Sequence, residues 1–440
     1  MCDEQVDEWV RKQAAETMGE LGSADGLLVL ARNEQVANER VRERAAEALG
    51  QLGWTEEATS CLLALARNEK VDEWARKDAA EALGKLGQAD EAISILLVLA
   101  RDKKIKAKVR LATAEMLGRL GHVQEATPIL LALAHDEEVE GWVRKDAAEA
   151  LCELGWAKEA TPILLALARN EQMGEYVRRA AAEMLGRLGH VEEAIFILLA
   201  LAHDEKVEEW VRKDAAEALG ELGWAGEAAP VLLALACDNQ VDEGVRKNAA
   251  EVLGRLGQTD EAAQAWLALV CDEQLDEWTR EQAAKTLSQL DRAGKAAQAW
   301  LALTRDEKMS WWTRERAAEA LGELGQTDRA ACILLTLARD EQADERGREQ
   351  AAAVLGRLGW ADEATSILLA LVCDEQVSKW VRRDATAALG QFADARVLPE
   401  LEHMAQRDAD KKVRRAAQKA IESICKRAGL SSDSESGLNG

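Results

Sequence analysis

The sequence contains no long hydrophobic run and few aromatic residues other than tryptophan. Its longest apolar runs, such as residues 129–134, are far shorter than the roughly 20 residues that cross a membrane. The N-terminus also lacks a basic segment followed by an apolar one. We therefore expect neither a membrane span nor a secretion signal, and a protein that works in the cytoplasm.

Motifs for catalysis, metal binding and disulfide bonding are missing as well. The five histidines are scattered, none of the eight cysteines forms a CxxC pair, and there is no phosphate-binding loop or nucleophile motif. Cys61 and Cys332 stand where other repeats have small or aliphatic residues, Cys152 replaces a glycine, and Cys237, Cys271 and Cys373 share one position of a repeat described below. We expect free thiols, buried or half-buried, in a reducing compartment. The sequence predicts no enzymatic activity, no cofactor and no metal site.

Positive charge is also in deficit. The chain has 56 Lys and Arg against 80 Asp and Glu, a net charge of −24. Long-range repulsion opposes binding to nucleic acid and to anionic membranes. We expect a protein partner with a basic or mixed surface instead.

What the sequence does contain is a 34-residue unit, well shown by residues 204–237. Val211, Ala215, Ala218, Leu219 and Leu222 recur at i, i+4, i+7, i+8 and i+11, which is one apolar stripe of a helix. The unit therefore opens with an amphipathic helix.

A second helix completes the unit. Gly223 stands where the end of the first helix requires a left-handed residue. Val231, Leu232 and Leu235 then form a second apolar stripe, and Pro230 is expected in a first turn, so this helix is expected to start close to Pro230.

Copies of the unit follow one another without interruption. The glycine after the first-helix leucine recurs every 34 residues from Gly50 to Gly390, with Cys152 and Ser288 as exceptions. Because neither helix can bury its stripe alone, the sequence predicts an all-α solenoid of about twelve stacked helix pairs. We expect one elongated domain at 1–428 and a disordered polar tail at 429–440. The chain opens inside a repeat, which predicts an uncapped N-terminal end and suggests a segment of a longer polypeptide.

The repeated motif Val-Arg-x-x-Ala-Ala-x-Ala-Leu-Gly-x-Leu-Gly, at residues 211–223, carries a family resemblance. It resembles the bacterial HEAT-like repeats named after phycobilisome lyases. Such arrays serve as lyase scaffolds, as adaptors and as C-terminal sensor regions of NACHT-type signalling ATPases, and this chain looks most like the sensor arrays. Tetratricopeptide repeats have the same period but need spaced Tyr and Phe, which this sequence does not supply.

Each copy also carries an arginine after its first apolar residue, such as Arg212 and Arg246, and an Asp or Asn at the end of the preceding helix. A guanidinium can hold a carboxylate and helix-end carbonyls together. We expect these arginines to tie repeats together. A phosphate-binding groove is the alternative, weakened by the acid supplied for each arginine.

Most tryptophans fall into two columns, each at one repeat position. The first column, at the entrance of the first helix, holds Trp74, Trp142, Tyr176, Trp210, Trp278, Trp312 and Trp380, with Trp9, Arg40, Lys108, Gly244 and Arg346 in other copies. The second, on the turn between helices, holds Trp54, His122, Trp156, His190, Trp224 and Trp360, with Gln88, Gln258, Arg292 and Gln326 in other copies. Polar residues at the same positions predict partial exposure.

Two interpretations of these columns stay open. The aromatic rings either cover neighbouring turns or bind a protein. Trp266 and Trp300 differ, since Ala-Trp replaces Ile-Leu there, a volume-conserving exchange expected in the core. The sequence thus predicts a protein-binding scaffold or sensor array. The alternatives are a phycobilin-lyase-like subunit that cradles a ligand and a spacer without a ligand; the oligomeric state is left open.

Overall fold

The computed structural model describes residues 23–33, 39–290, 292–340, 342 and 344–429. Within these residues the protein is all-α, with 24 α-helices, one short 3₁₀ helix and no strand. The prediction of an all-α solenoid of about twelve helix pairs is confirmed. The limits 1–428 and 429–440 stay predictions, because residues 1–22, with Trp9 and the uncapped start, and residues 430–440 lie outside the described part.

First and second helices alternate along the chain. The first helices are α3 (Glu39–Gln51), α5 (Glu73–Lys85), α7 (Ala107–Arg119), α9 (Gly141–Glu153), α11 (Glu175–Arg187), α13 (Glu209–Glu221), α15 (Glu243–Arg255), α17 (Glu277–Gln289), α19 (Trp311–Glu323), α21 (Glu345–Arg357), α23 (Lys379–Phe392) and α25 (Lys411–Ala428). The second helices are α2 (Ala24–Arg32), α4 (Thr55–Arg67), α6 (Ala89–Arg101), α8 (Val123–His135), α10 (Ala157–Arg169), α12 (Val191–His203), α14 (Ala225–Cys237), α16 (Thr259–Cys271), α18 (Ala293–Arg305), α20 (Thr327–Arg339), α22 (Ala361–Cys373) and α24 (Leu398–Arg407), the last preceded by the 3₁₀ helix Ala395–Val397.

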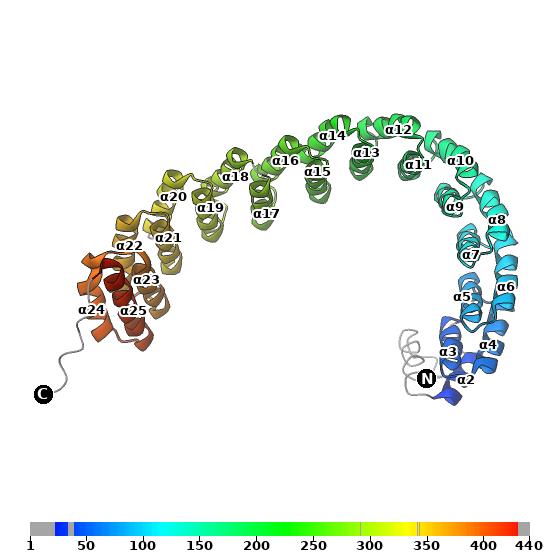
Figure 1. The fold of residues 1–440 in the computed structure, drawn as a ribbon, viewed down its shortest axis with the longest axis horizontal. Coiled ribbons are helices and arrows are strands. Elements are labelled where there is room, and N and C mark those ends of the chain that lie inside the picture. Colours follow the sequence, from blue (N-terminus) through cyan, green and yellow to red (C-terminus); the bar gives the residue numbers. More distant parts are fainter. Residues whose placement is uncertain (1–22, 34–38, 291, 341, 343, 430–440) are drawn as a thin grey trace. The chain divides into compact units, whose positions relative to one another are not determined.

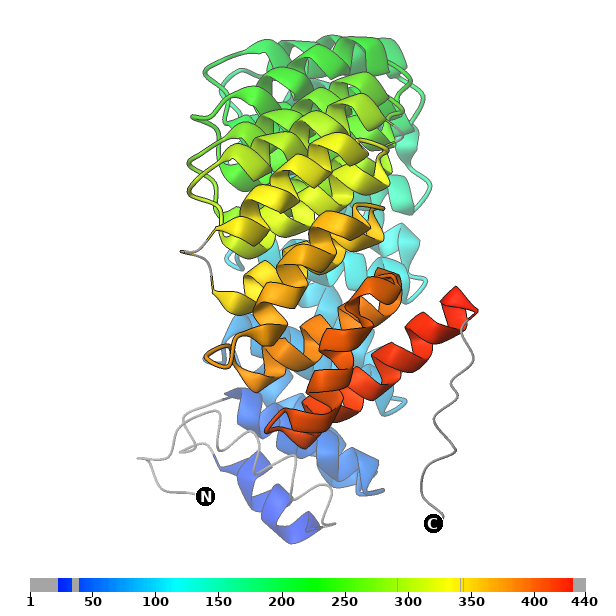
Figure 2. The ribbon, with the colours of Figure 1, turned by 90° about the vertical axis from the view of Figure 1, so that its left-hand side faces the viewer.

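The chain divides into two compact units, residues 1–222 and 223–440. Within each unit the first helices form one row and the second helices form another (Figure 1). Seen from the side, the helices of residues 223–440 lie one above another, with their connecting loops at the two ends of the helices (Figure 2). Each row therefore presents the same helix face again and again.

The core follows the two predicted stripes. Val211 and Leu219 of α13 and Leu232 and Leu235 of α14 are buried, while Leu222, at the end of its stripe, is only half-buried. Within residues 223–440 one continuous cluster of buried side chains runs from α19 to α25. The core is thus a layer between the row of first helices and the row of second helices, and each repeat extends it.

Glycine has two separate roles in each repeat. Gly223 has φ of 90°, as predicted for the left-handed turn that ends the first helix. Gly118 lies inside α7, and a Cβ added there would lie 2.9 Å from Cδ2 of Leu154 in the next repeat. The recurring helical glycine therefore gives room to the leucine of the following repeat.

The predicted start of the second helix at Pro230 is wrong. Helix α14 begins at Ala225, and its first helical bond runs from the Ala228 N–H to the Trp224 carbonyl at 3.1 Å. Pro230 lies inside the helix and is exposed, as is Gly226, whose carbonyl loses its partner. Water can bond that carbonyl, so packing of the apolar stripe decides where the helix starts.

None of the helices in the described part of the chain is both long and apolar enough to cross a membrane.

Candidate functional site

The first column lies at the second residue of each first helix, and we call it the entrance column: Arg40, Trp74, Lys108, Trp142, Tyr176 and Trp210 in residues 1–222, and Gly244, Trp278, Trp312, Arg346, Trp380 and Lys412 in residues 223–440. Trp74 and Trp142 are half-buried, and the other five aromatic residues are exposed. The predicted partial exposure at the helix entrance is confirmed.

Cations in the entrance column contact the rings of neighbouring repeats. The Lys108 Nζ lies 5.9 Å from the ring centroid of Trp74 and 5.5 Å from that of Trp142. The rings of Tyr176 and Trp210 follow, with centroids 6.1 Å apart. A lysine is tolerated in this column because the negative faces of two indoles attract it.

The same arrangement recurs in residues 223–440. The Arg346 guanidinium lies 6.0 Å from the Trp312 ring, and the Lys412 Nζ lies 4.6 Å from the Trp380 ring. Trp312 also meets Trp311 edge to face at 6.0 Å. Trp311 belongs to neither predicted column, and its doublet with Trp312 was the signal that could have revealed it. Trp312 and Trp380 thus each have a packing partner and are still 44% and 49% exposed.

The second column, which we call the turn column, lies at the position directly before the second helices. Trp54, His122, Trp156, His190, Trp224 and Trp360 are the residues that directly precede α4, α8, α10, α12, α14 and α22. Trp54, His190 and Trp224 are exposed, and the other three are half-buried. The predicted place on the turn and the partial exposure are confirmed.

The structure does not bring the two columns together. Trp142 lies at the start of α9 and Trp156 follows its end, so the 13 residues of that helix separate them. A helix of this length spans about 20 Å. The entrance and turn columns therefore line opposite edges of the helix rows and offer two separate surfaces.

Trp266 and Trp300 lie in the core, as predicted, and both are only 4% exposed. The Trp300 Nε1–H donates to the Ser288 Oγ at 2.8 Å. Ser288 is one of the two exceptions at the helical-glycine position, and its hydroxyl supplies the partner that a buried indole needs. Sequence reasoning did not connect these residues.

The arginine column ties repeats together, as predicted. The Arg246 Nε–H donates to the Ala236 carbonyl at 3.2 Å, and its Nη1 binds Asp272 at 2.6 Å. The acid therefore comes from the following repeat, not from the preceding helix end. Burial opposes ionisation of Asp272, but hydrogen bonds from Arg246 and from the Gln274 backbone hold its pKa below the usual value. Arg280 makes the same two contacts, with the Val270 carbonyl and with Asp306, so in these two repeats the guanidinium is already occupied.

The cysteines are free in the described part of the chain, but the predicted burial is wrong for four of them. Cys61 is buried and Cys152 and Cys425 are half-buried, as expected. The exposed ones are Cys237, Cys271, Cys332 and Cys373. Three of these are the last residue of a second helix, where the side chain projects beyond the packed turn.

Grooves between consecutive first helices form a third kind of surface, which sequence reasoning missed. Between α7 and α9 lies a cavity of about 440 Å³ lined by Glu115, Arg119, Asp146, Glu149 and Glu153. We call it the acidic groove. Its charges come from exposed or half-buried first-helix positions, whose residue types could have indicated its character.

A second cavity, of about 320 Å³, lies between first helices of residues 223–440 and contains two buried glutamates. Glu315 of α19 and Glu349 of α21 are each 6% exposed, and among the described residues neither carboxylate has a hydrogen bond or ion pair. Burial, reinforced by Glu319, raises the pKa of Glu315 to about 7. Burial, reinforced by Asp384, raises the pKa of Glu349 to about 7.

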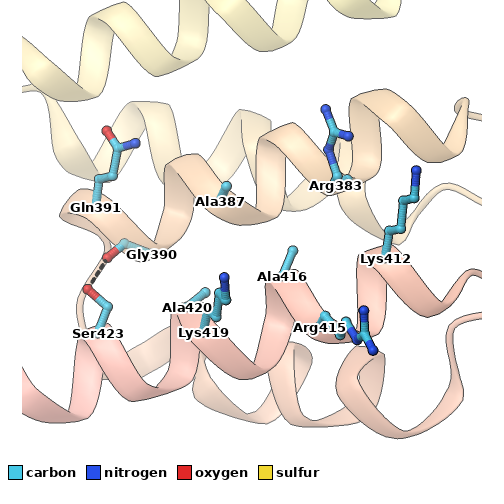
Figure 3. A pocket seen from close by; sticks show the side chains of 10 residues that line it. All are labelled: Arg383, Ala387, Gly390, Gln391, Lys412, Arg415, Ala416, Lys419, Ala420 and Ser423. Carbon is cyan, nitrogen blue, oxygen red and sulfur yellow. Dashed lines mark hydrogen bonds between the residues drawn. The ribbon is translucent and has the colours of Figure 1, made fainter.

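The third cavity, of about 410 Å³, lies between α23 and α25 and has the opposite charge. Its charged lining residues are Arg383, Lys412, Arg415 and Lys419, shown with the small residues between them in Figure 3. We call it the basic groove. Lys412 also belongs to the entrance column, so the basic groove and the entrance column meet at the N-terminal end of α25.

Comparison with known proteins identifies the repeat. The family model for HEAT repeats matches residues 2–84, 35–107, 69–152, 140–220, 205–288 and 341–422. No curated protein matches the chain in sequence.

Several solved structures align with this chain at low identity. Kap121p bound to Ste12p aligns with a TM-score of 0.48 and 13% identity, over 96% of this chain and 52% of that chain. Importin beta aligns with a TM-score of 0.48 and 13% identity, over 94% and 70%. Kap95p, in a study of its binding to RanGDP, aligns with a TM-score of 0.50 and 14% identity, over 96% and 65%. This chain thus spans about half the length of the Kap121p chain.

Proposed function

This chain belongs to the HEAT-repeat family, and on that basis we propose that it is a binding scaffold that holds a protein partner along the part of the entrance column that lies in residues 223–440. One observation carries the proposal. The three aromatic side chains of this part, Trp278, Trp312 and Trp380, are 44% to 64% exposed.

Exposed rings at one repeated position favour binding over packing alone. An apolar ring in water loses the free energy that burial would provide, and interface hot spots are enriched in Trp, Tyr and Arg. The cations beside Trp312 and Trp380 leave much of these rings open. A partner that covers the rings would also desolvate these cation–ring contacts and strengthen them.

Kap95p, which resembles this chain in fold alone, is described in its solved structure as binding RanGDP. It is a precedent for partner binding by a HEAT array and says nothing about which partner this chain takes. The proposal depends on the exposed rings of this chain.

A pull-down from the native cell lysate tests the proposal with matched variants. We expect Trp278→Ala/Trp312→Ala/Trp380→Ala to lose a protein that the wild type retains, while circular dichroism still shows a folded protein with only a small fall in melting temperature. The matched control is Val98→Ala/Leu120→Ala/Phe196→Ala, which removes three exposed hydrophobic side chains outside both columns.

The turn column is tested in parallel with Trp156→Ala/Trp224→Ala/Trp360→Ala. Loss of the partner from this variant alone would move the binding surface to the turn edge. Recovery of no protein by the wild type would contradict the scaffold function and favour a spacer.

Narrower roles rest on the repeat sequence. A sensor role within a larger NACHT-type ATPase would make the partner an activating ligand of that protein. A phycobilin-lyase-like role would place a chromophore on the array, which the absorbance spectrum of the purified protein tests. We infer a non-enzymatic role in a reducing cytoplasm from the missing catalytic motifs and the cysteine pattern.

A further inference from the structure

The basic groove has a narrow apolar floor between two closely packed helices. A Cβ added to Gly390 of α23 would lie 2.9 Å from the Ala420 Cα of α25. The Ser423 Oγ–H also donates to the Gly390 carbonyl at 2.8 Å, so the helices are joined at this end. Figure 3 shows Ala387 on α23 and Ala416 on α25, and both line the groove. Small residues keep the floor open along the helices.

Four cations surround this floor, and they differ in their partners. Lys412 and Arg383 lie 4.6 Å and 5.0 Å from the Trp380 ring, and Arg383 also binds Asp384 at 2.6 Å. Arg415 and Lys419 are exposed and make no hydrogen bond or ion pair within the described residues. Two cations are therefore held in place, and two are free to bind an outside anion.

The charge of this region is opposite to that of the chain. Residues 379–428 contain 12 Lys and Arg against 7 Asp and Glu, whereas the other 390 residues contain 44 against 73. Positively charged side chains on both walls of a groove attract anions and raise their local concentration.

We propose that the basic groove binds a carboxylate-rich peptide segment of a protein partner. Each carboxylate would accept charge-assisted hydrogen bonds from Arg415 or Lys419, and small apolar side chains would cover the alanine floor. The inference rests on the scaffold function proposed above and gives it a partner chemistry. Lys412 and Trp380 make the groove continuous with the entrance column.

The surroundings favour a short acidic peptide over nucleic acid. The neighbouring cavity, which shares Ala387 and Gln391 with the basic groove, carries the acids Glu315, Glu349 and Asp384. An extended polyanion would pass Asp384 and, above about pH 7, the ionised Glu315 and Glu349, and would be repelled. A peptide confined to the groove, about 20 Å long, needs only a few carboxylates.

Fluorescence anisotropy with the purified full chain tests the proposal. The probe is a fluorescein-labelled peptide of about eight residues, alternating Glu and Ala, which spans the groove when extended. We expect binding that weakens with salt, and Arg415→Glu/Lys419→Glu should weaken it by about tenfold or more. The matched control, Lys411→Glu/Lys426→Glu, makes the same change in net charge on exposed positions of α25 outside the groove and should change affinity by less than about twofold.

Three results would overturn the proposal: equal weakening by the two variants, tighter binding of a single-stranded oligonucleotide of the same charge, or self-association that Arg415→Glu/Lys419→Glu abolishes. Circular dichroism and melting temperature verify folding, and Arg415→Gln/Lys419→Gln repeats the test without introducing acids. Because the probe needs no native partner, a failed pull-down and a failed peptide titration are separate results.

Discussion

The acidic groove between α7 and α9 and the basic groove between α23 and α25 are built on the same element of the repeat and have opposite charge. Their volumes, about 440 and 410 Å³, are similar. Glu149 and Glu153 line the first, whereas Arg415 and Lys419 line the second. The packed helices set the shape of each groove, and a few exposed first-helix positions set what it attracts.

Packing beneath the two grooves differs in what the helical glycine meets, which is backbone at Gly390 and a leucine side chain at Gly118. Mutation of these glycines should give the largest effect. Gly390→Ala should destabilise the protein by about 3 kcal/mol, because the added methyl meets the backbone of Ala420. Gly118→Ala should cost less than about 1 kcal/mol, because the half-buried Leu154 side chain can rotate away and alanine favours the helix. Urea unfolding of both variants measures the difference. Equal losses would contradict the rigid contact at Gly390.

Buried charge gives the next effect, up to about 3 kcal/mol for each group. The pKa of Glu315 and of Glu349 is raised from 4.5 to about 7 in the folded protein. The folded state therefore binds more protons than the unfolded chain between these values, and stability falls as pH rises from about 4.5 to about 7. Glu315→Gln and Glu349→Gln should stabilise the protein near pH 8 and change little near pH 5, by urea unfolding at both.

Glu281→Gln is the matched control for these two changes. Glu281 occupies the same first-helix position and is equally buried, but Arg316 and Lys285 bind its carboxylate. Its replacement should destabilise the protein near pH 8, because the two cations lose their partner. If Glu281→Gln stabilised the protein as well, burial of the carboxylate alone would explain the effect, and the lack of an ion-pair partner at Glu315 and Glu349 would not matter.

Charge exchange on the acidic groove should have the smallest effect on stability and should change binding. Glu149→Lys/Glu153→Lys breaks the ion pair of Glu149 with Lys145, which is 3.0 Å long and only partly buried, at a cost below about 1 kcal/mol. The variant should gain affinity for the acidic peptide used on the basic groove. Anisotropy titration measures it, and no gain would mean that charge alone does not determine what a groove binds.

Much of the fold follows from the sequence because it depends on contacts inside one repeat. The spacing of Val211 and Leu219 and the turn at Gly223 are local signals, and the structure confirms them. The error at Pro230 arose from applying a local rule where packing against neighbours decides. Cys237 was misplaced because exposure at a helix end depends on the next loop.

The grooves could not be predicted because they depend on residues that different repeats contribute. Glu315 and Glu349 are 34 residues apart, and their missing partners are visible only when the first helices are placed side by side. The cation contacts of Lys108 with Trp74 and Trp142 are of the same kind. Repeat position indicates which residues are exposed, whereas the neighbouring copies determine what each residue meets.

Photo-crosslinking in living cells tests the entrance column most directly. A photoreactive phenylalanine analogue replaces Trp278, which is 64% exposed in the column, or Phe196, which is 76% exposed outside both columns. The proposed scaffold predicts a protein adduct at position 278 and none at position 196. Equal labelling at both positions, or none at 278, would contradict partner binding along the entrance column.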